Sequence, residues 1–142
     1  MKTAFAVLLF ALSLLVSAAA GADEGVVKAV YHVDDWESQT FYTLRSLRSH
    51  LQIDPKAQLH VVTYANGIDF LMLGASNSKG EPYAKAVQEL IAQGVVFKVC
   101  NNTLLGRDIP RDRILPEVQI VPSGTVEIIE LQSKRGFAYI KP

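Results

Sequence analysis

Residues 94–104 of this 142-residue chain have the sequence GVVFKVCNNTL. Within them, Val95–Val99 is rich in β-branched residues and predicts a strand of a buried sheet. Cys100 follows this strand directly, and one of the next three residues can cap a short helix. The stretch therefore predicts a strand that passes straight into a helix start, with a cysteine at the junction.

Similar strand patterns occur on both sides of this stretch, and segments with helical spacing separate them. Along the chain, the expected strands are residues 26–33, 59–64, 95–99, 118–121 and 137–140. The expected helices are residues 36–51, 82–93, about 101–106, and a last one that starts after Ser123 and is closed by Gly136. This alternation predicts an α/β fold with a five-stranded, mostly parallel sheet and helices on both faces.

Three of the expected helices carry apolar residues that would pack on the sheet. The residues expected to point inward are Phe41, Leu44, Leu47 and Leu51 in the first helix, Ala86, Leu90 and Ile91 in the second, and Val126, Ile128 and Ile129 in the last. Asp34 or Asp35 can cap the first helix, because a carboxylate accepts hydrogen bonds from free amides at a helix start.

The composition excludes several classes of protein. The chain is 49% hydrophobic, with 14 basic and 14 acidic residues, which suits one folded domain and leaves no basic excess to bind nucleic acid. Its single cysteine excludes an intramolecular disulfide and a four-cysteine zinc site. Because nucleotide-binding glycine patterns and three-ligand metal spacings are missing, we expect no cofactor and no metal.

The first 22 residues have the pattern of a secretory signal peptide. One positive charge at Lys2 precedes the largely apolar run Ala4–Val16, and small residues follow, with cleavage expected after Ala20 or Ala22. The mature chain, residues 23–142, would then be a single domain that works in the periplasm or is secreted. We expect it to have no membrane attachment after cleavage.

Polar or turn-forming residues follow four of the expected strands. In a parallel sheet, ligands gather at the carboxyl ends of the strands, so we expect these residues to share one edge. They are Asp34 and Asp35, Asn66 and Gly67, Cys100 with Asn101 and Asn102, and Pro122 and Ser123.

Two residues at this edge have more than one interpretation. At a helix start, free amides would favour the thiolate of Cys100 and make it nucleophilic; alternatively, the residue is a packed structural cysteine. His32 lies close to Asp34 and Asp35 and could bind a metal or be oriented by a carboxylate, although a packed histidine is the favoured interpretation. The segment 107–113, RDIPRDR, could grip an anion, but a surface loop or subunit contact is favoured.

The ordered set of these segments resembles the DsrE/DsrF-like family. The stretches that carry the resemblance are VKAVYHVDD (residues 27–35), LHVVTYANGIDFL (59–71), GVVFKVCNNTL (94–104) and the tail from residue 118 to 142. The resemblance implies a three-layer α/β/α sandwich and a homo-oligomer, commonly a trimer or a hexamer. It also implies sulfur relay through a persulfide on a cysteine at the end of the third strand, a position that Cys100 matches.

Two hypotheses of function follow. In the first, Cys100 accepts sulfane sulfur from a donor and passes it to an acceptor protein or thiol, supported by amides or caps at Asn101, Asn102 and Thr103. In the second, the domain is a non-enzymatic module whose sheet edge holds a small ligand or a partner. A reactive thiol at the open edge favours the first hypothesis, and an inaccessible thiol with an ordinary pKa favours the second.

Overall fold

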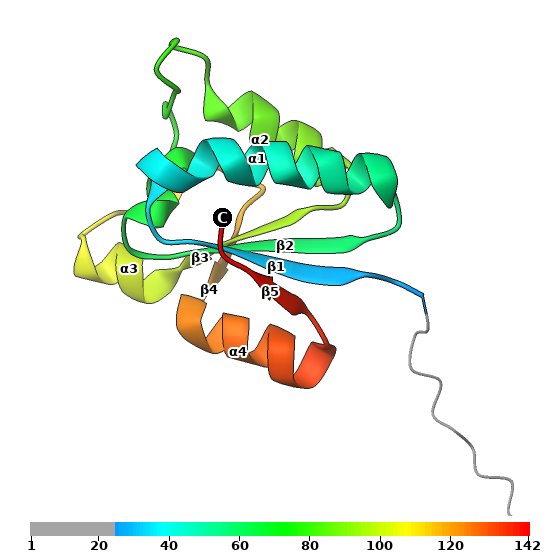
Figure 1. Cartoon of the computed structure of the whole chain (residues 1–142). Coiled ribbons are helices and arrows are strands. Elements are labelled where there is room, and N and C mark those ends of the chain that lie inside the picture. The colour runs from blue at the N-terminus through cyan, green and yellow to red at the C-terminus, as the bar shows by residue number, and fades with distance from the viewer. Residues whose placement is uncertain (1–24) are drawn as a thin grey trace, which may run out of the picture.

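The computed structural model describes residues 25–142, so the predicted signal peptide lies outside the described residues. Five strands and four α-helices alternate along the chain (Figure 1). In order, the elements are β1 (Lys28–Val33), α1 (Trp36–Ile53), β2 (Gln58–Thr63), the 3-10 helix η1 (Ala65–Leu71), α2 (Tyr83–Ala92), β3 (Val96–Cys100), α3 (Asn101–Gly106), the 3-10 helix η2 (Arg111–Arg113), β4 (Gln119–Val121), α4 (Gly124–Arg135) and β5 (Ala138–Ile140).

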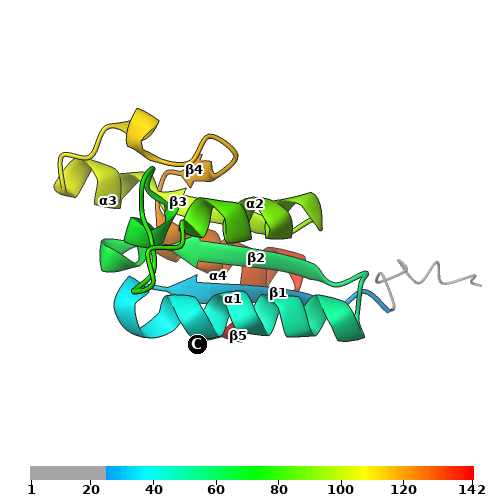
Figure 2. The same ribbon diagram turned by 90° about the horizontal axis from the view of Figure 1, so that it is seen from above.

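The five strands form one sheet in which every pairing is parallel, in the order β4-β3-β2-β1-β5. Helices α1 and α2 cover one face and α4 covers the other, which gives the three layers visible in Figures 1 and 2. The predicted α/β sandwich is therefore confirmed, with a sheet that is wholly parallel. No helix of residues 25–142 has both the length and the apolar character needed to cross a membrane.

Two apolar clusters hold the layers together. The larger one fills the space between the sheet and α1, α2 and η1, where Leu47, Phe70 and Phe97 are almost fully buried. The smaller one lies under α4 and consists of Val30, Val62, Ile128, Leu131 and Phe137. The apolar cluster under α4 is the smaller of the two, so polar side chains of β1, β2 and β3 can occupy the remaining part of this face of the sheet.

The expected inward faces of α1 and α4 are correct only in part. Leu44, Leu47 and Leu51 are buried in α1. Phe41 is 65% exposed, because the buried position one turn before Leu44 is occupied by Thr40. In α4, the inward residues are Gly124, Ile128 and Leu131, which follow a spacing of four and three. The predictions for Val126 and Ile129 are wrong, since both are more than half exposed.

The expected face of α2 is nearer to the structure. Leu90 is fully buried, and Ala86 and Ile91 pack partly buried against the larger cluster. Val87, which the spacing did not single out, is also fully buried.

Candidate functional site

Cys100 lies where the predicted junction places it, as the last residue of β3 and the N-terminal cap of α3. Its side chain is 5% exposed. The backbone N–H groups of the first turn of a helix have no acceptor within the helix, so those of α3 are free to face the sulfur. A second helix start is nearby, because Cys100 pairs in register with Val121 of β4 and α4 begins at Gly124.

Both helix starts place donor groups near the thiol of Cys100. Burial alone raises the pKa of this thiol, but hydrogen bonds from the backbone N–H of Gly124, the N–H and hydroxyl of Thr103, and the N–H of Asn102 outweigh it. The pKa of Cys100 is therefore lowered from its ordinary value. A buried sulfur with several donors is stabilised as the thiolate, which is the nucleophilic form.

Gly124 makes this close approach possible. A Cβ atom at position 124 would lie 3.3 Å from the Cβ of Cys100 and 3.1 Å from Cδ1 of Tyr64. Both distances are tighter than ordinary van der Waals contact. Without a side chain, the first residue of α4 fits between Cys100 and Tyr64 and brings its N–H to the sulfur.

The hydroxyl of Thr103 is oriented by η1. It accepts a hydrogen bond from the N–H of Ala65 at 3.0 Å, which leaves its own proton free to point at the sulfur. Ala65 has a left-handed backbone conformation, with φ of 49°. Arg107 holds this residue in place, since its Nη1 donates to the carbonyl of Ala65 at 3.0 Å and to Oδ1 of Asp69 at 2.7 Å.

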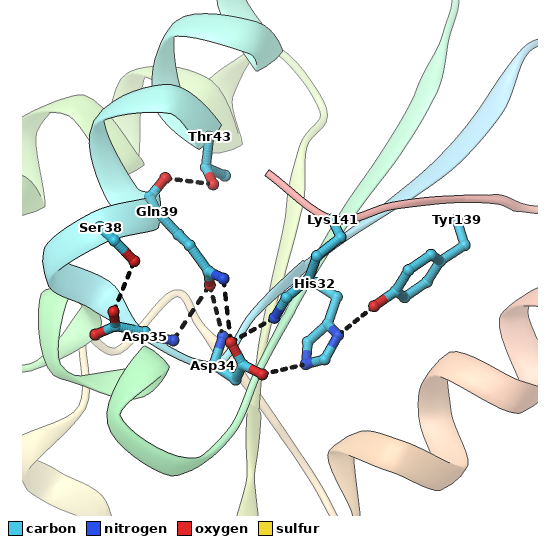
Figure 3. Close-up of polar contacts among 8 residues, drawn as sticks. All are labelled: His32, Asp34, Asp35, Ser38, Gln39, Thr43, Tyr139 and Lys141. Atoms are coloured by element: carbon cyan, nitrogen blue, oxygen red, sulfur yellow. Dashed lines mark hydrogen bonds and ion pairs between the residues drawn. The ribbon is translucent and has the colours of Figure 1, made fainter.

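A second polar cluster surrounds His32 at the end of β1 (Figure 3). The Nδ1 atom of His32 lies 2.6 Å from the hydroxyl of Tyr139, and Nε2 lies 3.8 Å from Oδ2 of Asp34. Burial lowers the pKa of His32, the charge of Lys141 lowers it further, and that of Asp34 opposes both. The imidazole is therefore neutral at pH 7; its Nδ1 shares a hydrogen bond with the hydroxyl of Tyr139, and its buried Nε2 has no hydrogen-bond partner among the described residues.

Asp34 is held from two sides. Its Oδ1 accepts a hydrogen bond from Nε2 of Gln39 at 3.1 Å and forms an ion pair with Lys141 (Figure 3). The hydrogen bond from Lys141 is the main reason that the pKa of Asp34 is lowered. The carboxylate therefore stays charged beside the imidazole of His32.

The expected capping of α1 by an aspartate side chain is wrong. Asp35 occupies the capping position, but its carboxylate makes no bond to a backbone amide and accepts instead from the hydroxyl of Ser38 at 2.6 Å. Oε1 of Gln39 instead accepts from the two residues before the helix, the N–H of Asp34 at 2.9 Å and that of Asp35 at 3.2 Å.

The remaining predicted site residues are exposed or make other contacts. Asn66 is exposed in η1, and Asn101 uses its Oδ1 to accept from Nη2 of Arg111 at 2.7 Å. The segment 107–113 is exposed at most positions, and Arg107 and Arg111 tie it to η1 and α3. Among residues 25–142, no group of three or more His, Cys, Asp and Glu side chains is arranged to hold a metal ion.

Four residues that the sequence did not single out complete the site: Tyr64, Gly124, Tyr139 and Lys141. They come from the ends of β2 and β5 and from the start of α4, and the order of the strands brings them together. From β3 to β5, Cys100, Tyr64, His32 and Tyr139 form a row across four neighbouring strands at the carboxyl edge. Only the Ser-Gly start of α4, after a strand, gives a signal in the sequence.

The sequence as a whole matches the DsrE/DsrF-like family over residues 15–142. The chain belongs to this family. Among curated proteins, none matches it. The structure of the protein of unknown function MTH1491 from Methanobacterium thermoautotrophicum is similar, with 31% identity and a TM-score of 0.72 over 82% of this chain and 99% of that one. The crystal structure of the ychN protein from E. coli shares the fold, with 18% identity, a TM-score of 0.69, and coverage of 82% and 100%. The family is associated with sulfur relay.

Proposed function

We propose that this protein carries sulfane sulfur as a persulfide on Cys100. The observation that carries the proposal is the place of one buried sulfur at the start of α3 and beside the start of α4, where a set of donors from Gly124, Thr103 and Asn102 lowers its pKa. Such a set stabilises a negative charge on sulfur both before attack and when the sulfur leaves again. The membership of a sulfur-relay family supports the same chemistry.

Each half of the reaction is a displacement at sulfur. The thiolate of Cys100 attacks the outer sulfur of a donor R–S–SH. A bond forms between Sγ and this sulfur, the S–S bond of the donor breaks, and RS⁻ leaves with its electron pair. An acceptor thiolate then attacks the outer sulfur of the Cys100 persulfide, and the Cys100 thiolate leaves. Because the chain has one cysteine, the persulfide cannot collapse into an internal disulfide.

Intact-mass analysis after treatment with inorganic polysulfide tests this proposal. The native chain should gain the mass of one or more sulfur atoms, and a reducing thiol should remove it, whereas Cys100→Ser should gain none. The serine variant should keep its fold, because the two side chains differ little in volume, so a loss of folding would assign Cys100 a packing role. A folded native protein that gains no sulfur would favour the alternative, a non-enzymatic binding module.

Export and assembly belong to the same proposal. The pattern of residues 1–22 supports work in the periplasm or outside the cell. Exposed apolar side chains on α1, among them Phe41, Tyr42 and Ile53, support a homo-oligomer, for which we propose a trimer or a hexamer. Light scattering on the mature chain tests the assembly, and a monomer at micromolar concentration would contradict it.

A further inference from the structure

Lys98 and Glu127 form an ion pair that is buried between β3 and α4. Lys98 lies in β3 two residues before Cys100, so both side chains leave the strand on the same face. The side chains of the pair are 6% and 17% exposed. The cost of removing two charges from water can exceed the energy of their attraction, so the net stability from such a pair is small. What a directional contact of this kind does specify is the position of one element on another.

The first turn of α4 has few other ties to the sheet. Gly124 has no side chain, and the two residues after it are exposed. The capping serine before it accepts a hydrogen bond from a backbone N–H of the same turn and so acts within the helix. The apolar contacts of α4 with the sheet begin at Ile128. Glu127 is therefore the side chain that links this turn to the sheet, through Lys98.

The same turn is the part of α4 that meets Cys100. A Cβ atom on Gly124 would lie 3.3 Å from the Cβ of Cys100, so the helix backbone at this residue lies directly against the cysteine. The N–H of Gly124 is one of the donors that favour the thiolate. Because Lys98 is two residues before Cys100 and Glu127 is three residues after Gly124, the ion pair and this contact join the same strand to the same helical turn.

We propose that the Lys98–Glu127 ion pair holds the first turn of α4 against β3 and so keeps the N–H of Gly124 at the sulfur of Cys100. Both members of the pair are positioning residues, since they act through Gly124 and not on the thiol itself. This inference rests on the proposed function, because it concerns the thiolate that would accept sulfur. His60 of β2 also lies near the pair: burial and then the charge of Lys98 lower its pKa to about 4. It therefore stays uncharged over the pH range in which the thiol titrates.

The pH dependence of Cys100 alkylation by iodoacetamide separates positioning from a direct effect of charge. A direct effect would give opposite shifts, because Lys98→Met removes a cation and would raise the thiol pKa, whereas Glu127→Gln removes an anion and would lower it. Positioning predicts that both variants raise it, because either change frees the turn. The loss of one hydrogen bond to the thiolate should lower the alkylation rate about tenfold at a pH below the thiol pKa.

A double variant, Lys98→Met with Glu127→Met, tests the same claim if the single variants are unstable. It leaves no unpaired buried charge and should fold, which urea unfolding checks. Its thiol pKa should also rise, because an apolar contact does not fix the turn in one position. The matched control is Lys134→Met, which breaks the exposed ion pair with Glu130 on the same helix and should leave the profile unchanged.

Opposite shifts for the two single variants would overturn the inference, because the charges would then act directly on the thiol. A native profile for the folded double variant would also overturn it, as would an equal shift in the Lys134→Met control. Alkylation does not depend on polysulfide loading, so a failure here would leave the proposed function standing.

Discussion

Replacing Thr103 with valine should remove one hydrogen-bond donor to the Cys100 thiolate, because valine has nearly the shape of threonine but no hydroxyl. The oxygen of this hydroxyl already accepts from the N–H of Ala65, and its own hydrogen bond to Cys100 is one of the causes that lower the pKa of the thiol. A hydrogen bond to a charged group contributes about 1.5–3 kcal/mol, and 1.36 kcal/mol corresponds to a tenfold change in an ionisation equilibrium. The fraction of thiolate below the thiol pKa should therefore fall by about ten- to a hundredfold.

The pH dependence of Cys100 alkylation by iodoacetamide measures this fraction. The chain has one cysteine, so the rate reports on a single thiol. Thr103→Val should move the alkylation profile to higher pH, because the pKa of Cys100 rises when a donor to its thiolate is lost. Thr103→Ser, which keeps the hydroxyl, should stay close to the native profile. An unchanged profile for the valine variant would refute the view that side-chain donation from α3 supports the thiolate.

Three further predictions concern the surroundings of the site. Gly124→Ala should lower the alkylation rate of Cys100 and destabilise the fold by about 1–3 kcal/mol in urea unfolding, because its Cβ would crowd Cys100; native values would contradict the tight contact. Burial, with the charges of Lys98 and Arg135, lowers the pKa of His60 to about 4, below its unfolded value of about 6.5. Below pH 6.5 the unfolded chain therefore binds more protons than the folded chain. The free energy of unfolding, which is at its full value above pH 6.5, should fall by up to about 3 kcal/mol as the pH drops towards 4. In urea titrations, His60→Leu should make the free energy of unfolding depend less on pH. Lys141→Met should raise the pKa of His32, since the charge of Lys141 lowers it and that of Asp34 would be left to raise it; an NMR titration of the imidazole that shows no rise would refute this coupling.

The parts of the site that are local in sequence could be predicted from it. A strand that runs into a helix start sets Cys100 beside the free amides of Asn102 and Thr103. Residues 94–104 alone predict both the strand and the helix start. The alternation of strands and helices likewise predicts the layers, because parallel strands need a crossover between them. Neither inference depends on the order of the strands in the sheet.

The parts of the site that could not be predicted depend on the order of the strands in the sheet. Tyr139 meets His32 only because β5 pairs with β1 at the far side of the sheet, and alternation does not specify which edge the last strand joins. Gly124 reaches Cys100 because β4 pairs with β3, a contact between residues 24 positions apart. The outward positions of Phe41 and Val126 have a related cause: spacing shows that a helix is amphipathic, whereas the neighbouring elements decide which turn of it is covered.

Transfer of sulfur out of the loaded protein tests the central claim most directly. The chain is first loaded with polysulfide and freed of excess reagent, and a small thiol acceptor is then added while the protein mass and the acceptor persulfide are followed together. A carrier predicts that the mass returns to that of the unmodified chain as acceptor persulfide appears, with one sulfane sulfur released for each singly loaded Cys100. Sulfur that stays on the protein, or that is lost without any acceptor persulfide being formed, would contradict the account.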